Sequence, residues 1–221
     1  ENMWTTEYVD HYTYDSNGNQ LTSVYYENDP DTGESTVSGK EEYAYDSNNN
    51  QILYISSSWD YENEDWVGDY KEESEYDSDG NLILYISYSW DYLENTWMAT
   101  NKQESIFENG MKKMDSYSNW DYESSDWTSP TVETFEYIDD LLVSIITTGS
   151  DNNYDGEINK LDWRKTGFFY NSQKNLTSVV SYENIDENVV WEASEKTEYS
   201  YNEDQEIETA IYSFIMEEEW I

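Results

Sequence analysis

The fold is decided by a stretch that reads WVGDYKEESEY (66–76), DSDGN (77–81), LILYISYSW (82–90) and DYLEN (91–95). Two runs rich in Tyr, Ile, Leu, Trp and Ser are each followed by a cluster of Asp, Asn and Gly. Such alternation is typical of a strand, a turn, a second strand and a second turn. Asp, Asn and Gly tolerate the positive φ that a tight hairpin connection requires. The stretch therefore predicts two antiparallel strands.

The same pattern recurs along the whole chain. Each copy carries an aromatic anchor close before an acidic turn, and successive anchors are 30 to 33 residues apart. A fixed period of this length is typical of repeat architectures. We therefore predict one β-repeat domain over residues 1–221, built of seven repeats. The anchors are Tyr14, Tyr45, Tyr76, Phe107, Tyr137, Tyr170 and Tyr201.

The expected fold is all-β, an antiparallel meander of about fourteen strands with two strands per repeat. Period-two alternation places Leu82, Leu84, Ile86, Tyr88 and Trp90 on one face of the sheet. Both faces carry aromatic residues. Three arrangements remain open from the sequence: a sheet curled into a barrel, a superhelical sheet, and a single twisted layer.

Charge limits the partners. The chain has 50 acidic and 10 basic residues, for a net charge of −40. Such a field repels nucleic acid and anionic membrane surfaces and favours cations. No apolar run approaches the ~18–20 residues of a membrane span, so no membrane insertion is expected. With no Cys, disulfide and thiol chemistry are excluded. The sequence leaves the oligomeric state open.

Half of the basic residues occupy one position of the repeat, five residues before the anchor. Glu occupies the position three before the anchor in four of the same repeats. Side chains two apart on a strand share a face, so we interpret these residues as a Lys–Glu ladder that partly neutralises the sheet. The lysines are Lys40, Lys71, Lys102, Lys165 and Lys196, and the glutamates are Glu42, Glu73, Glu104 and Glu198.

The pieces of the form YTYDSNGN (12–19) resemble YD repeats of the RHS type. The longer unit, with Ser-Trp-Asp and a second Trp, is similar to tandem repeats in secreted proteins of marine Bacteroidota. The period is longer than in the RHS type, so the encapsulating role of RHS shells carries over poorly. The resemblance implies a secreted or cell-surface bacterial protein that accompanies polysaccharide-degrading modules.

Residues 151–162 resemble the twelve-residue calcium loop of EF-hands and dockerins. Asp151, Asn153 and Asp155 fall at positions 1, 3 and 5, and Gly156 falls at the turn position. The carbonyl of Glu157 and the carboxylate of Asp162 complete the expected ligands, with Asp at the twelfth position where Glu is usual. Hard cations require several oxygens on a tightly turned backbone. We therefore predict Ca²⁺ as the cofactor, against the alternative of an acidic hairpin turn.

A Trp-Asp-Tyr motif recurs at the end of three strands. Equivalent strands of a meander lie two apart, so the motif should recur every ~10 Å. Aromatic rings stack on the apolar faces of sugars, while flanking polar groups bind hydroxyls. The alternative is that each Trp packs the sheet. The candidate carbohydrate-binding residues are Trp59, Asp60, Tyr61, Trp90, Asp91, Tyr92, Trp120, Asp121 and Tyr122.

No catalytic motif accompanies these features. His11 is the sole His and occupies a strand position where other repeats carry Glu. We therefore predict no enzyme activity and expect a secreted, non-catalytic module that binds polysaccharide on an aromatic platform, with structural calcium. Two alternatives stay open: a structural or adhesive cell-surface repeat protein, and a polysaccharide-degrading enzyme of unusual fold.

Overall fold

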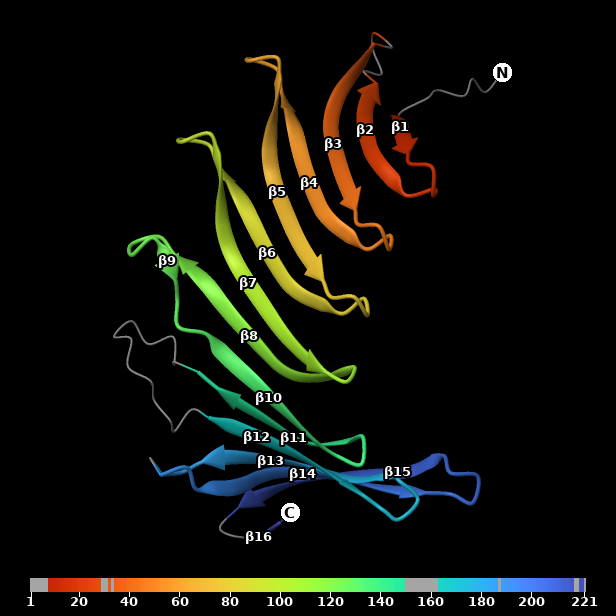
Figure 1. Ribbon diagram of the computed structural model, residues 1–221, viewed down its shortest axis with the longest axis vertical. Helices are drawn as coiled ribbons and strands as arrows, with labels where there is room; N and C mark the ends of the chain where they lie inside the picture. The colour runs from red at the N-terminus through yellow and green to blue at the C-terminus, as the bar shows by residue number, and fades with distance from the viewer. Residues whose placement is uncertain are drawn as a thin grey trace. The chain divides into compact units, whose positions relative to one another are not determined.

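The structure is a computed structural model, and it describes residues 8–28, 32, 34–149, 163–186, 188–216 and 219–220 (Figure 1). All regular secondary structure in these ranges is β-strand. No helix in this part of the chain could span a bilayer. The predicted all-β class is confirmed.

The strands follow one another in an antiparallel meander. Two of the sixteen, β9 and β16, have two residues each, which leaves the fourteen longer strands that the repeat predicts. The strands are β1 (Tyr8–Tyr14), β2 (Gln20–Asn28), β3 (Ser35–Tyr45), β4 (Gln51–Asp60), β5 (Asp65–Tyr76), β6 (Leu82–Asp91), β7 (Thr96–Glu108), β8 (Met111–Asp121), β9 (Asp126–Trp127), β10 (Thr131–Ile138), β11 (Leu141–Thr148), β12 (Arg164–Tyr170), β13 (Leu176–Asn184), β14 (Trp191–Tyr201), β15 (Ile207–Met216) and β16 (Glu219–Trp220).

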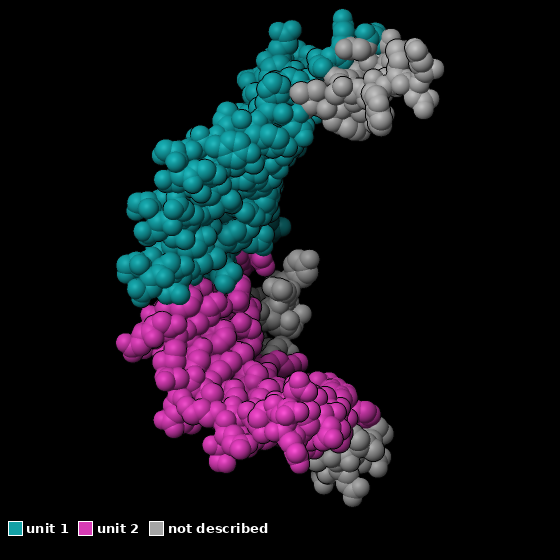
Figure 2. All heavy atoms as spheres, turned by 90° about the vertical axis from the view of Figure 1, so that its right-hand side faces the viewer, with its two compact units in different colours: residues 1–104, 122–125 teal, residues 105–121, 126–221 magenta. Residues whose placement is uncertain are grey.

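The chain divides into two compact units (Figure 2). Unit 1 comprises residues 1–104 and 122–125, and it contains β1 to β6 with most of β7. Unit 2 comprises residues 105–121 and 126–221, and it contains the strands from β8 onward. Figure 1 shows the strands of each unit lying side by side in chain order.

The strand order is open. Among the described residues β1 pairs with β2 alone, and β15 pairs with β14 along its length and with β16 over two residues. Among the described strands no ladder joins the first to the last, so they do not form the barrel, which was one of the arrangements that the sequence left open.

Short Asx turns close the hairpins at the anchor end. In the third repeat, Asp77 Oδ1 accepts the backbone N–H of Asp79 and of Asn81, both at 2.9 Å. Gly80 has φ +83°, and Asn49 takes the equivalent place in the second repeat with φ 66°. These are the two residue types that adopt this backbone region most readily. The Asp-x-x-Gly/Asn-Asn sequence is therefore explained by the turn itself.

A β-bulge follows each of these turns. Tyr76 pairs with Leu82, whereas Glu75 pairs with Leu84, so Ile83 is an additional residue in β6. Cross-strand partners share a face and neighbours on β5 alternate. Leu82 and Leu84 therefore lie on opposite faces, and the prediction that they share one is wrong. The same register shift occurs at Tyr14, Tyr45, Tyr137, Tyr170 and Tyr201.

Little hydrophobic surface is buried. In the described part of the chain Val180, at 7% exposure, is the one buried hydrophobic residue. The buried polar residues are mostly serines in the middle of strands, such as Ser23, Ser57 and Ser87. Each unit is therefore stabilised mainly by backbone ladders and by cross-strand side-chain contacts on the two faces of its sheet.

Candidate functional site

The two faces of the sheet in unit 1 differ in chemistry. Pairing of Trp59 with Trp66, Ile55 with Lys71, and Trp90 with Trp97 places these residues on one face, called here the Trp face. Pairing of Tyr43 with Tyr54 and of Glu41 with Ser56 defines the opposite face, called here the Tyr face. Each face carries its own arrangement of aromatic and charged groups.

The tryptophans of the Trp-Asp-Tyr motif form cross-strand pairs. Trp59 and Trp66 have ring centroids 5.1 Å apart at 76°, and Trp90 and Trp97 lie 5.0 Å apart at 79°. In unit 2, Trp120 and Trp127 lie 5.2 Å apart at 84°. Edge-to-face geometry is favourable for aromatic rings. These half-buried rings close the hairpins, so they are poorly placed to offer a free ring face to a ligand.

Lysines cover part of the Trp face. Lys40 Nζ lies 5.0 Å from the ring centroid of Trp66, and Lys71 Nζ lies 3.9 Å from that of Tyr88. The same ammonium groups contact glutamates two residues along the strand, at 2.8 Å for Glu42 and 2.9 Å for Glu73. Lys102 and Lys196 make the equivalent contacts with Glu104 and Glu198. The predicted Lys–Glu ladder is confirmed in four repeats.

The aspartates of the motif hold turns. Asp60 Oδ1 accepts the backbone N–H of Glu62 at 2.8 Å, and its Oδ2 accepts the Asn63 side-chain amide at 2.6 Å. The hydrogen bond from Asn63, followed by those from the backbone, lowers the pKa of Asp60. Asp91 likewise accepts the N–H of Leu93 at 2.8 Å. These carboxylates hold the turns. Only the lone pairs that the turns do not use could accept a hydrogen bond from a ligand.

The tyrosines of the motif are the exposed members. Tyr61, Tyr92 and Tyr122 are 61%, 67% and 53% exposed. Tyr61 Oη donates to the carbonyl of Val37 at 2.6 Å, and Tyr122 Oη donates to the carbonyl of Ala99 at 3.4 Å. Each of these two rings is thereby anchored to the first strand of its own repeat while its surface stays accessible. All three tyrosines belong to unit 1, and they are called here the tyrosine row.

The Tyr face carries a feature that the sequence reasoning missed. Glu41 accepts hydrogen bonds from Tyr25 at 2.5 Å, Tyr43 at 2.7 Å, Ser23 at 2.9 Å and Tyr54 at 3.0 Å. Burial alone would raise the pKa of Glu41, but these hydrogen bonds lower it overall. The recurrence of Glu four residues before the anchor, between tyrosines of neighbouring strands, is the signal that could have revealed it.

A second such cluster surrounds Glu72. Its Oε1 accepts hydrogen bonds from Tyr85 at 2.7 Å and from Tyr70 at 2.9 Å, and the two phenol oxygens are themselves 2.9 Å apart. Because tyrosines of neighbouring strands donate to these carboxylates, the Tyr face works as a hydrogen-bonded support for the sheet.

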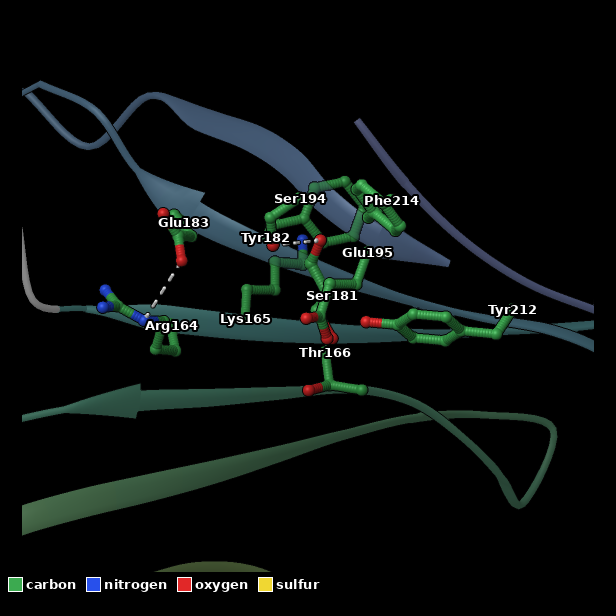
Figure 3. A pocket seen from close by; sticks show the side chains of 10 residues that line it. All are labelled: Arg164, Lys165, Thr166, Ser181, Tyr182, Glu183, Ser194, Glu195, Tyr212 and Phe214. Atoms are coloured by element: carbon green, nitrogen blue, oxygen red, sulfur yellow. Dashed lines mark hydrogen bonds and ion pairs between the residues drawn. The ribbon is translucent and has the colours of Figure 1, made fainter. Parts of the chain in front are cut away.

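Unit 2 holds an open pocket of about 670 Å³ formed by β12, β13, β14 and β15. Figure 3 shows the Arg164–Glu183 pair at one side and the rings of Tyr212 and Phe214 at the other. Arg164 Nε lies 3.9 Å from Glu183 Oε1, and both side chains are about half exposed. The pocket offers stacking surface, hydroxyl groups and both signs of charge. The sequence did not predict this pocket, although Arg164, which lines it, is the sole Arg of the chain.

The predicted calcium ligands Asp151, Asn153, Asp155, Glu157 and Asp162 lie outside the described residues. Within the described ranges no group of three or more His, Asp or Glu is arranged to hold a metal ion. The ring of His11 contacts that of Tyr26 on the neighbouring strand, with centroids 5.2 Å apart and planes inclined at 60°. The described sites can therefore stack and hydrogen-bond a ligand, and they present no nucleophile paired with a histidine base.

Comparisons with known proteins give matches among solved structures, all at low TM-score. No protein-family model matches the chain, and no curated protein matches it significantly. A DUF3836 family protein from Bacteroides vulgatus is 15% identical, with TM-score 0.35, over 43% of this chain and 92% of that chain. Its counterpart from Parabacteroides distasonis is 21% identical, with TM-score 0.33, over 41% and 80%.

The structure of TcdB2-TccC3-Cdc42 is similar over 94% of this chain and 15% of that chain, at 10% identity and TM-score 0.25. The matched structures include proteins of Bacteroides and Parabacteroides and the TcdB2-TccC3 assembly. At such low TM-scores these similarities carry no argument about function.

Proposed function

We propose that this chain is a secreted or cell-surface, non-catalytic carbohydrate-binding module of a bacterial protein, and that the tyrosine row binds the glycan. The observation that carries the proposal is the exposure of Tyr61, Tyr92 and Tyr122 on consecutive hairpins, at 61%, 67% and 53%. Exposed aromatic rings on a rigid scaffold are what sugar stacking requires, because ordering the ring on binding then costs little entropy.

The spacing of the row suits an extended glycan. Tyr61 follows β4, Tyr92 follows β6 and Tyr122 follows β8, so successive rings lie two strands, or ~10 Å, apart. This repeat is close to the length of a disaccharide in an extended chain. The sequence assigned the stacking role to the whole Trp-Asp-Tyr motif. We now assign it to the tyrosines, with the tryptophan pairs and turn aspartates positioning them.

Charge sets the class of glycan. The turn segments 60–65, 91–95 and 121–126, which carry the row, contain Asp and Glu but no Lys or Arg. An anionic polysaccharide would meet repulsion there unless cations bridge the charges. We therefore propose a neutral polysaccharide as the ligand. Stacking then contributes through apolar area, and binding should change little with salt.

Calcium has a structural role in this proposal. The ligands assigned from the sequence are Asp151, Asn153, Asp155, the Glu157 carbonyl and Asp162. Their spacing supports a hard-cation loop within the fifth repeat. Because this loop is remote in sequence from the tyrosine row, glycan binding to a neutral polymer should survive removal of calcium as long as the chain stays folded.

The test is affinity electrophoresis against a panel of neutral polysaccharides, followed by calorimetry on the one that retards the protein. Tyr92→Ala should weaken binding at least tenfold without changing the melting temperature. Tyr12→Ala, which removes a 47% exposed tyrosine of unit 1 outside the row, should leave affinity unchanged. Binding that survives replacement of all three tyrosines would refute the proposal.

The second candidate is a structural or adhesive repeat protein of the cell surface. It is favoured by the apolar residues on β15, where Ile207, Ile211 and Tyr212 are more than half exposed. Exposed apolar strands at a sheet edge are sites of association between chains.

A further inference from the structure

We infer that β15 of one copy of this chain pairs with β1 of a second copy, so that copies associate head to tail through the interface that joins successive repeats. This inference is independent of glycan binding. It starts from the junctions between repeats, which obey one register throughout the described strands.

In every junction, the residue three before an anchor pairs with the residue seven or eight after the preceding anchor. The shorter interval occurs where the turn has one residue fewer. The pairs are Thr22–Glu42, Leu53–Glu73, Leu84–Glu104, Met114–Thr134, Ser144–Gly167 and Ser178–Glu198. Six junctions with the same pairing show that the second strand of any repeat fits the first strand of another.

β15 presents one half of this junction. It is the second strand of the seventh repeat, and its outer edge is paired in the described residues only where Ile215 and Met216 meet β16. Ile211 is 58% exposed, whereas Val24, Ile55 and Ile86, which occupy the same position in inner repeats, are half-buried. The inner residues are less exposed because the first strand of the next repeat lies beside them, whereas no such strand lies beside Ile211 among the described residues.

The edge of β15 also lacks the usual protection. Edge strands are commonly guarded by Lys or Pro. From Ile207 to Met216, the strand has neither, and Glu208 is its one charged residue. Ile207 and Phe214 add further exposed apolar surface, at 59% and 43%. This strand is therefore competent for pairing along most of its length.

β1 presents the other half of the junction between repeats. It is the first strand of the first repeat and has β2 as its sole neighbour in the described part of the chain. Extending the common register places His11 opposite Thr209 and Asp10 opposite Ala210. His11 stands where four later repeats have Glu, so β1 carries less negative charge at this position than an inner first strand.

A second copy is the occupant that these observations favour. The outer edges of β1 and β15 are halves of an interface that the chain itself forms six times, so the two edges are complementary. Pairing between different surfaces of two copies is heterologous, and it yields open chains unless the rotation between copies closes a ring. Each copy carries a charge of −40. Association should therefore strengthen with salt, as the Debye length falls from about 10 Å at 0.1 M to about 3 Å at 1 M.

Sedimentation velocity at rising protein concentration, in 0.1 M and 1 M NaCl, tests for association. Oligomers should grow with concentration and be favoured by 1 M salt. Ile211→Lys should weaken association at least tenfold. The matched control is Ile138→Lys, which alters a 63% exposed isoleucine of unit 2 away from the β15 edge and should leave association unchanged. Circular dichroism establishes that both variants are folded.

Disulfide trapping tests the register. Because the chain has no cysteine, the pair His11→Cys and Thr209→Cys supplies the only thiols. Directly opposed residues of an antiparallel pair have Cα atoms about 4.5–5.5 Å apart, which a disulfide can bridge. Oxidation should give a ladder of linked oligomers, and His11→Cys with Ile138→Cys should not. A monomer under every condition, or equal linkage by both pairs, would overturn the inference.

Discussion

Trp97 lies directly against the backbone of Gly68. A Cβ placed on Gly68 would be 2.5 Å from Cζ2 and 2.6 Å from Cη2 of Trp97, and 2.8 Å from Cε3 of Trp90. The edge-to-face pair formed by Trp90 on β6 and Trp97 on β7 thus packs on the main chain of β5, which belongs to the repeat before that of Trp97. In a sheet that buries little hydrophobic surface, this contact joins neighbouring repeats on the Trp face.

Gly68→Ala should destabilise the protein by about 1–3 kcal/mol, the usual cost of overpacking. The added methyl group would have to displace two indole rings that are held by their neighbours. Thermal unfolding followed by tryptophan fluorescence measures the effect. Gly39→Ala is the matched control, because the nearest atom to its Cβ would be Tyr25 Cδ2 at 3.4 Å, an ordinary contact. Equal losses in the two variants would contradict the proposed role of Gly68.

Trp90→Ala should lower stability by about 3 kcal/mol, near the lower end for truncating a large aromatic residue, because its ring is half-buried. Its cross-strand partner Trp97 would lose the edge-to-face contact at 5.0 Å. Urea unfolding provides the measurement. Leu93→Ala, at a side chain that is 90% exposed, should change stability by no more than about 0.5 kcal/mol. A stable Trp90→Ala protein with lost glycan affinity would instead return the stacking role to the tryptophan.

Acid should weaken the protein through Glu41. Its folded-state pKa is lowered overall, because the hydrogen bonds from three tyrosines and Ser23 outweigh the opposing effect of burial. A depressed carboxylate pKa contributes stability that is present above the unfolded pKa and is lost as pH falls through the folded value. Stability measured from pH 6 downward should thus decline less steeply in Glu41→Gln than in the wild type. Parallel curves would show that Glu41 has no part in the decline.

Alkali should weaken the Tyr face for the opposite reason. Burial, together with the hydrogen bond to Glu41, raises the pKa of Tyr54 to about 12. A raised folded pKa contributes stability that is fully present below the ordinary value near 10 and is lost as pH rises through about 12. Absorbance at 295 nm should therefore show a late-ionising group of tyrosines, and Tyr54→Phe should remove one member. A single transition near pH 10 for all tyrosines would contradict this expectation.

Calcium removal should lower the melting temperature, because a ligand that binds the folded state stabilises it by mass action. Adding EDTA to calcium-loaded protein is the measurement, and Asp155→Ala should reproduce the fall without chelator. Asp79→Ala serves as a control, since Asp79 lies in an ordinary hairpin turn whose Asp77 already caps the backbone. An unchanged melting temperature with EDTA would count against a structural calcium site.

Much of the fold could be predicted because its determinants are local. The turn residues Asp77, Gly80 and Asn81 satisfy one another within five positions, so their sequence alone indicates a hairpin. The Lys71–Glu73 contact is likewise set by two residues of one strand. The candidate site was harder to predict, since the sequence could not tell which member of Trp90, Asp91 and Tyr92 would be exposed.

What the sequence determined by itself was the all-β meander, its period and its turns, because each depends on residues close together along the chain. The tertiary structure decided which aromatic rings are covered, which side chains share a face and which strand edges stay open. Bulges such as the one beside Tyr76 shift the alternation by one residue. Contacts such as Tyr61 with Val37 join positions 24 residues apart. Both outcomes arise only when strands that are separated in the chain pair with one another.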